Sequence, residues 1–171
     1  MEPRVTDAER TRTVTWQDPL RSASAARELG GLEHLRAMVR GEVPPPPIAE
    51  LMGFTLDSVE VGRVAFAVKP GEHHYNPIGV VHGGLSATLL DSALGCAIYS
   101  TLPPGVAWTT VELHVNFVRA ITADTGRLVC TASVLHGGSR VATAEGKLTD
   151  EKGVLYAHGT TTCLILRPKG A

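Results

Sequence analysis

Residues 76–95, NPIGVVHGGLSATLLDSALG, bring a histidine, two adjacent glycines and one aspartate into a single segment. His82, Gly83 and Gly84 stand at the start of a run with helical spacing, and Asp91 follows inside that run. Most residues three or four positions from Asp91 are small, so its carboxylate lies in a notch that another group can approach. Such a carboxylate is either paired for structure or kept for chemistry.

Asp91 has no cation near it in the sequence, because no Lys or Arg occurs between Lys69 and Arg119. A carboxylate that loses water without gaining a cation becomes a better base or nucleophile. Two interpretations therefore stay open. Asp91 is a catalytic carboxylate, or it is a hydrogen-bonded, partly buried aspartate with no role in catalysis.

The two glycines point to a second chemical group. Glycine weakens a helix, so Gly83 and Gly84 need a functional or conformational reason at this position. The first amides of a helix are unpaired and carry the positive end of its dipole. Without side chains in the way, these amides can receive an anionic oxygen at close range, as an oxyanion hole does. A tight turn that requires glycine is the alternative.

The spacing between the two groups constrains how they can cooperate. Gly83 and Asp91 are eight residues apart, which is about 12 Å along a helix. Reacting atoms must approach to about 3–3.5 Å, so one carbonyl carbon cannot meet both groups of one helix. If both groups serve one reaction, the spacing predicts a dimer with antiparallel helices and two composite sites.

The first third of the chain has helical patterns. Residues 18–31 predict a helix with Asp18 as its N-cap, and residues 32–42 carry an apolar stripe at helical spacing. The four prolines at 44–47 predict an extended spacer, followed by a short helical turn that ends at Gly53. We expect residues 1–47 to be an N-terminal helical extension with a proline-rich linker, and residues 48–171 to be the main domain.

From residue 53 onward the pattern is mostly that of strands. Two short strands are expected at 54–62 and 62–70, then a helix at 82–100 that is apolar nearly all round and must be enclosed. Four further strand patterns follow, and the short turn sequences TADTG, HGGS and DEKG between them predict antiparallel neighbours. The predicted fold class is α+β, with an antiparallel sheet wrapped around one long central helix.

Composition excludes several classes of function. The net charge is −1 and the basic residues are scattered, which argues against binding to nucleic acid or to an anionic membrane. No apolar run approaches the roughly 20 residues that span a bilayer, and the charged N-terminus is not a signal peptide, so we expect a cytoplasmic protein. The three cysteines are widely spaced and predict buried small side chains. The pair His73 and His74 predicts a solvated loop and not a metal site, because a third ligand at suitable spacing is missing.

The segment Asn76 to Asp91 resembles the signature of hotdog-fold thioesterases of the PaaI-like and 4-hydroxybenzoyl-CoA thioesterase group. The later TTVELHVNFVRAI resembles the long strand that follows the central helix of that family. The resemblance covers about residues 48–166. It implies a hotdog homodimer, often paired into a homotetramer, that hydrolyses acyl-CoA thioesters without a metal, a cofactor or a prosthetic group.

The resemblance also implies roles for five residues. Asp91 matches the catalytic carboxylate, which acts as the nucleophile or as the base for water. Gly83 matches the backbone donor to the thioester oxygen, and His82 a hydrogen-bonding group beside the thioester. Asn76 matches the residue that positions the carbonyl or the attacking water, and Thr110 falls where the family has a Ser or Thr beside that water.

Two further assignments concern the threonine beside the attacking water and the residues that bind CoA. Strict alternation along residues 106–120 places Thr109, and not Thr110, on the face of Val111 and Leu113, so both threonines stay candidates. The resemblance further implies that a second group of residues binds the substrate, with Arg140 as the contact to a phosphate of CoA. This group consists of Gly84, Gly137, Gly138, Ser139 and Arg140.

Other readings of the sequence remain as alternatives. A hotdog module that binds acyl-CoA as a sensor needs none of Asn76, His82 and Asp91, so the presence of all three favours an enzyme. A hydratase needs a histidine a few residues after the aspartate on the same helix, and the sequence SALGCAIYS has none. A serine hydrolase needs a G-x-S-x-G elbow, which is also missing here. Apolar lining from Leu89, Leu90 and Val111 would accept either an aryl or a medium-chain acyl group.

Overall fold

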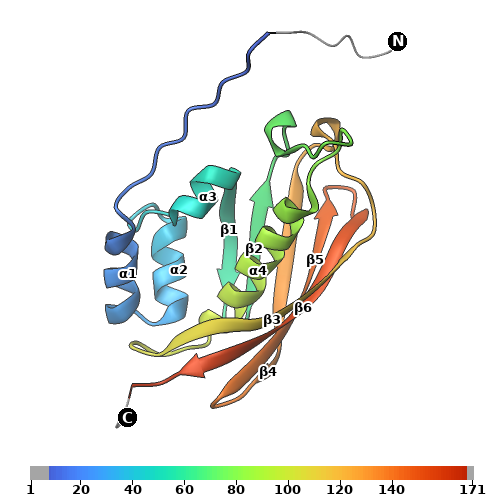
Figure 1. Cartoon of the computed structure of the whole chain (residues 1–171). Coiled ribbons are helices and arrows are strands. Elements are labelled where there is room, and N and C mark those ends of the chain that lie inside the picture. Colours follow the sequence, from blue (N-terminus) through green and yellow to red (C-terminus); the bar gives the residue numbers. More distant parts are fainter. Residues whose placement is uncertain (1–7, 169–171) are drawn as a thin grey trace.

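The computed structural model describes residues 8–168, which form one antiparallel sheet curled around one long helix (Figure 1). The order of the strands in the sheet is β1-β2-β4-β5-β6-β3. Their bounds are β1 Phe54–Glu60, β2 Arg63–Val68, β3 Ala107–Phe117, β4 Leu128–Gly137, β5 Val141–Asp150 and β6 Leu155–Leu166, and the central helix is α4, Gly83–Tyr99. This architecture confirms the predicted α+β fold with a wrapped central helix.

The central helix is enclosed because its side chains are apolar nearly all round. Leu89, Leu90, Ala93 and Leu94 have no exposed surface, and they pack against the inner face of the sheet. Sheet residues such as Leu128 are equally buried in the same core. Burying a leucine contributes about 1.5–3 kcal/mol, so this helix is a main source of stability. Leu89 and Leu90 thus belong to the core, and the expectation that they line an acyl pocket is wrong.

One predicted strand connection is wrong. The turns at HGGS and DEKG do join antiparallel neighbours, β4 to β5 and β5 to β6. The sequence TADTG does not, because β3 pairs with β6 whereas β4 pairs with β2. Residues 118–127 instead carry the chain across the molecule, through a 3₁₀ turn at Ala123–Thr125, and Ile121 O accepts a hydrogen bond from Val81 N at 2.9 Å. The connection is a crossover anchored beside the start of α4.

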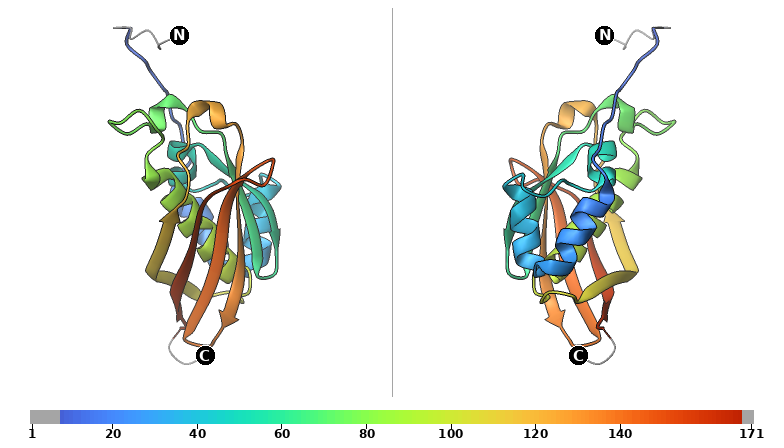
Figure 2. Two further views of the ribbon diagram at one scale, coloured as in Figure 1. Left: turned by 90° about the vertical axis from the view of Figure 1, so that its right-hand side faces the viewer. Right: turned by 90° about the vertical axis from the view of Figure 1, so that its left-hand side faces the viewer.

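The N-terminal extension contains two helices, α1 (Pro19–Glu28) and α2 (Gly31–Val39), which lie together against one side of the domain (Figure 2). The Asp18 carboxylate accepts from Leu20 N at 2.9 Å, which confirms the predicted N-cap. The proline run is extended only to Pro46, because Pro47 is already the first residue of the short helix α3 (Pro47–Met52). Residues 1–7 of the predicted extension and residues 169–171 of the predicted main domain lie outside the described residues.

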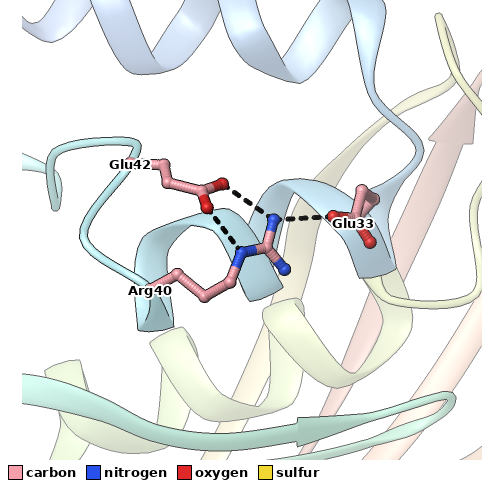
Figure 3. Close-up of polar contacts among 3 residues, drawn as sticks. All are labelled: Glu33, Arg40 and Glu42. Carbon is pink, nitrogen blue, oxygen red and sulfur yellow. Dashed lines mark hydrogen bonds and ion pairs between the residues drawn. The ribbon is translucent and has the colours of Figure 1, made fainter.

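An arginine fixes the end of α2 (Figure 3). The Arg40 guanidinium contacts Glu33 Oε1 at 2.7 Å and binds both carboxylate oxygens of Glu42. The hydrogen bonds from the Arg40 guanidinium are the main reason that the pKa of Glu42 is lowered. All three side chains are solvent-exposed, so the pairs define the turn after α2 more than they stabilise the fold. Among residues 8–168, no helix is long and apolar enough to cross a membrane.

Candidate active site

Asp91 and Thr110 form a hydrogen-bonded pair between α4 and β3. Thr110 Oγ1 donates to Asp91 Oδ1 at 2.9 Å, and both residues are half-buried. The pairing of β3 with β6 passes from Thr110 opposite Cys163 directly to Glu112 opposite Thr162, so Val111 forms a bulge. A bulge adds one residue and reverses the side-chain alternation beyond it. Thr110 therefore faces the aspartate.

The bulge corrects the predicted faces of this strand. Val111 was expected to share the face of Leu113, yet Val111 is 54% exposed. Leu113 and Val115 do pack against the core. Val111 therefore cannot line a pocket beside Asp91. Nothing in the local sequence pattern marks the bulge, because the stretch alternates regularly when it is read without the partner strand.

Asp91 opens into a cavity of about 520 Å³ beside α4. Its walls come from α4, β3, the strands β1 and β2, the short helix α3 and the N-terminal extension. They are lined by His34, Leu35, Met38, Val39, Pro45, Pro46, Ala49, Glu50, Phe54, Thr55, Leu56, Phe66, Asp91, Ser92, Gly95, Cys96, Tyr99, Trp108 and Thr110. No Lys or Arg is among these residues. The cavity therefore brings no cationic side chain to Asp91, as the neighbouring sequence also predicted.

The contribution of the N-terminal extension was missed by the sequence analysis. His34, Leu35 and Met38 of α2 and two residues of the proline run all line the Asp91 cavity. The apolar stripe on residues 32–42 indicates a buried face, but it carries no signal for which surface that face covers. Only the fold brings α2 beside α4, more than fifty residues later in the chain.

Cys96 lies one helical turn after Asp91 and also lines the cavity. Burial, and then the nearby charge of Asp91, raise the pKa of the Cys96 thiol to about 12. A thiol with this pKa stays protonated near neutral pH and is a poor nucleophile. Cys130 and Cys163 are buried, as the sequence predicted, whereas Cys96 is half-buried. Among the groups that line the cavity, Asp91 is thus better suited than Cys96 to attack or to accept a proton.

The N-terminus of α4 presents separate polar groups. His82 Nδ1 accepts from Gly84 N at 2.8 Å, so the Gly84 amide is occupied within the chain. The Gly83 amide donates to no acceptor within residues 8–168 and stays available. An imidazole that accepts at Nδ1 carries its proton on Nε2 in the neutral form. The Gly83 N–H and the His82 Nε2–H are therefore two donors at one helix end.

Asn76 lies in the loop before this helix end. Its Oδ1 accepts from Ile78 N at 3.1 Å and from Val80 N at 3.3 Å, which shapes the turn and orients the side chain. These bonds occupy the oxygen and leave the side-chain NH₂ as a donor. Asn76 precedes His82 and Gly83 in the loop that leads into α4. None of these three residues lines the Asp91 cavity. One chain alone does not bring the predicted site together.

The turn at residues 137–140 lies at the opposite end of β3 from Gly83. Arg140 O accepts from Ile165 N at 2.9 Å, and Ile165 pairs with Trp108 at the start of β3. A Cβ placed on Gly83, in contrast, would contact the ring of Phe117 at the end of that strand. Gly137, Gly138, Ser139 and Arg140 are thus separated from Gly84, and none of them lines the Asp91 cavity.

The histidine pair outside this site differs from its prediction. His74 is buried, and its Nε2 lies 2.9 Å from Met52 O at the end of α3, so the pair is not simply solvated. Burial is the main reason that the pKa values of His73 and His74 are lowered. No group of three or more potential metal ligands occurs within the described part of the chain.

Comparison with known proteins identifies the family. The family model described as the thioesterase superfamily matches residues 78–157. Acyl-coenzyme A thioesterase 13 of Homo sapiens is 32% identical over 133 residues, which cover 76% of this chain and 93% of the human protein. The 1,4-dihydroxy-2-naphthoyl-CoA hydrolase of Listeria monocytogenes is 28% identical over 122 residues, which cover 71% of this chain and 98% of that enzyme.

A solved structure supports the same assignment. The phenylacetic acid degradation-related protein of Ralstonia eutropha JMP134 superposes with a TM-score of 0.69 at 30% identity, covering 76% of this chain and 98% of the other. The chain therefore belongs to the thioesterase superfamily and has the hotdog fold. The predicted family and fold are confirmed.

Proposed function

We propose that this protein is an acyl-CoA thioesterase that hydrolyses the thioester at Asp91. The observation that carries the proposal is the Thr110–Asp91 pair, set in a largely apolar cavity whose lining includes no Lys or Arg. A carboxylate with one fixed hydrogen-bond donor and no cation keeps its capacity to attack or to accept a proton. The relatives named as hydrolases of acyl-CoA and of an aryl-CoA support this class of substrate.

Asp91 has two chemically balanced routes. As a base, it takes a proton from water while the water oxygen bonds to the thioester carbon, and the C–S bond then breaks to release CoA, which takes up the proton. As a nucleophile, it forms an acyl anhydride with release of the CoA thiolate, and water then hydrolyses that anhydride to the free acid and the Asp91 carboxylate, with a proton from the water passing to the thiolate. Thr110 donates to one oxygen of Asp91, so the other oxygen is left to face the reacting atoms.

The donors for the thioester oxygen come, in this proposal, from a second copy of the chain. The Gly83 amide and the His82 Nε2–H lie at the start of α4, about 12 Å along the helix from Asp91, and Asn76 lies in the loop that leads to this helix end. Antiparallel α4 helices of two subunits bring each Asp91 to the other subunit's Gly83. Negative charge that develops on the thioester oxygen is then met by fixed donors, which lowers the barrier.

The edge of the sheet suggests where the two copies meet. β3 is an edge strand, and an unpaired edge readily adds another strand. Large apolar side chains along and after this strand, Val111, Phe117 and Val118, are each more than half exposed. Pairing of two β3 strands buries them and runs the two α4 helices antiparallel. A homodimer is the smallest assembly with complete sites, and a homotetramer made of two such dimers is compatible with it.

The remaining predicted residues are assigned to CoA. The turn of Gly137, Gly138, Ser139 and Arg140 is exposed at the end of the sheet, apart from Gly138, which is half-buried. The Arg140 guanidinium is suited to bind a phosphate of CoA. Gly84, whose amide is held by His82, contributes by leaving room for the substrate and not by donating a hydrogen bond.

A panel of acyl-CoAs assayed by thiol release tests the proposal, with Asp91→Asn as the comparison. Turnover of at least one aliphatic or aryl acyl-CoA by the unaltered protein is expected. The variant should lose roughly 10²–10⁴-fold in kcat with little change in KM, the range typical for loss of an acid–base group. Equal rates would make Asp91 structural. Binding of acyl-CoA without turnover would favour the sensor alternative.

A further inference from the structure

The N-terminal extension is built into the Asp91 cavity and does not merely flank the domain. A Cβ at Gly31 would lie 1.7 Å from Tyr99 O, so the first turn of α2 rests directly on the backbone of α4. Gly31 N also donates to Leu102 O at 2.9 Å. These contacts fix α2 in position, and its Leu35 and Met38 form the wall that faces α4 across the cavity.

The polar side chains in this part of the lining, His34 and Tyr99, hydrogen-bond to each other, and His34 also bonds to Ser22. His34 is only 4% exposed, with Nε2 3.3 Å from Ser22 Oγ and Nδ1 3.2 Å from Tyr99 Oη. Burial lowers the pKa of His34, so its imidazole is neutral near neutral pH. This series of hydrogen-bonded side chains, from Ser22 through His34 to Tyr99, therefore presents no charge to a ligand.

The end of the cavity away from Asp91 is aromatic. Tyr99 lies eight residues after Asp91 on α4, about 12 Å along the helix. Its ring stacks on Trp108 with centroids 4.0 Å apart and an angle of 18° between the planes. Gly95 lies between Asp91 and Tyr99, and a Cβ there would meet Trp108 Nε1 at 3.1 Å. The cavity thus extends from a carboxylate to a rigid, uncharged end.

Charge inside the cavity is of one sign only. The acidic lining residues are Asp91 and Glu50, and Glu50 is exposed at the surface. A carboxylate on the acyl group would lose its water there without meeting a cation, and it would be repelled by Asp91. Burial of an unpaired charge is strongly unfavourable. Aliphatic and aryl groups meet no such penalty.

We infer that α2 of the N-terminal extension determines acyl selectivity, so that the cavity accepts uncharged, apolar acyl groups of limited size and excludes acyl groups that end in a carboxylate. This inference rests on the proposed thioesterase activity and adds a selectivity-determining wall from outside the matched family region. Met38 is the most useful position for a test, because it lines the cavity and is only half-buried.

Two pairs of substrates test the inference on the full-length protein. Hexanoyl-CoA and adipyl-CoA have equal chain length, and only adipyl-CoA ends in a carboxylate. We expect kcat/KM for adipyl-CoA to be lower by about 100-fold or more, because its charge is buried unpaired. Butyryl-CoA and decanoyl-CoA, in turn, measure the size limit of the cavity.

Met38→Trp places bulk in the cavity, and Arg36→Trp places the same bulk on the exposed face of the same helix. We expect Met38→Trp to lower the decanoyl-to-butyryl ratio of kcat/KM by about tenfold or more, as size changes in apolar pockets do. Arg36→Trp should leave the ratio unchanged. Met38→Ala should shift the ratio the other way, which keeps the test valid if the tryptophan variant folds poorly.

The outcomes separate the two proposals. If the unaltered protein hydrolyses no acyl-CoA, the proposed function fails. If it hydrolyses them but adipyl-CoA matches hexanoyl-CoA, the charge argument is overturned. If it hydrolyses them and both Met38 variants keep the original chain-length ratio while their melting temperatures show folded protein, α2 does not set selectivity.

Discussion

Thr110 donates a hydrogen bond to Asp91 across the contact between β3 and α4, with 2.9 Å between Oγ1 and Oδ1. The two residues are nineteen positions apart in the chain. A bulge at Val111 is what turns Thr110 toward the helix, while its neighbour Thr109 is exposed on the other face. The pair fixes the orientation of the carboxylate, and this provides a direct test with a matched control.

Thr110→Val should lower kcat by about tenfold or somewhat more, because a hydrogen bond to a charged group contributes about 1.5–3 kcal/mol. Thr110→Ser keeps the hydroxyl and should retain most of the activity. Thr109→Val makes the same change on the exposed face and should have little effect. Steady-state kinetics on one acyl-CoA gives the comparison. Equal losses for the Thr109 and Thr110 variants would show that the hydroxyl does not act through Asp91.

The sequence predicted those parts of the fold that depend on local patterns. The enclosure of α4, the strands on either side of it and the N-cap at Asp18 all follow from hydrophobic spacing and capping chemistry. The crossover at residues 118–127 and the bulge at Val111 were not predicted, because each depends on which strand becomes the neighbour. Pairing partners are non-local, and a short turn sequence does not identify them.

The same distinction applies to the site. The residues of the central motif can be found by spacing, and the structure places Asp91 beside Thr110 and keeps Gly83 apart. The wall from α2 could not be found in this way. Leu35 and Met38 carry the pattern of any amphipathic helix, and only the close approach at Gly31 determines what they cover. Selectivity was therefore the least predictable property.

Gly31→Ala should destabilise the protein by about 1–3 kcal/mol, as other forced overpacking does. The added Cβ would lie 1.7 Å from Tyr99 O, and a backbone atom inside the fold cannot move aside easily. Gly137→Ala is the control, because nothing lies within 4 Å of a Cβ at that position. Urea denaturation of both variants measures the difference. A Gly31→Ala midpoint equal to that of the control would mean that α2 does not rest tightly on α4.

His34 should make the folded state less stable below neutral pH. Its pKa is lowered from 6.5 by burial, so between its folded pKa and pH 6.5 the unfolded chain binds more protons than the folded chain. The free energy of unfolding then rises with pH across this window. The stability is fully present above about pH 6.5 and is lost as the pH falls toward the folded pKa.

Urea denaturation at pH 5.5 and pH 7.5 measures this dependence, with His34→Gln as the variant that does not titrate. The unaltered protein should lose more stability between the two pH values than the variant does. His73 and His74 also have lowered pKa values, so some dependence should persist in the variant. Identical losses in the two proteins would mean that His34 has the same pKa in the folded and in the unfolded chain, and that its burial does not affect its titration.

The composite site gives the most demanding prediction. Gly83→Pro removes the amide proton itself, and the structure accommodates it, because Gly83 is the first residue of α4 and His82 before it is extended (φ −62°, ψ 134°). Gly83→Ala adds a Cβ at the same place, near the ring of Phe117, but keeps the amide. The proline variant should therefore be inactive and the alanine variant should keep substantial activity.

Mixing two inactive variants tests whether the halves come from different chains. Homodimers of Asp91→Ala and of Gly83→Pro have no complete site, whereas a mixed dimer has one, made from the intact Asp91 of one chain and the intact Gly83 of the other. Random pairing makes half the dimers mixed, so co-refolding should restore roughly a quarter of the original activity. Native mass spectrometry counts the mixed dimers, and circular dichroism shows that the proline variant is folded. If mixed dimers form and activity does not return, each site lies within a single chain, and the Gly83 amide must then serve the α4 helix and not the thioester oxygen.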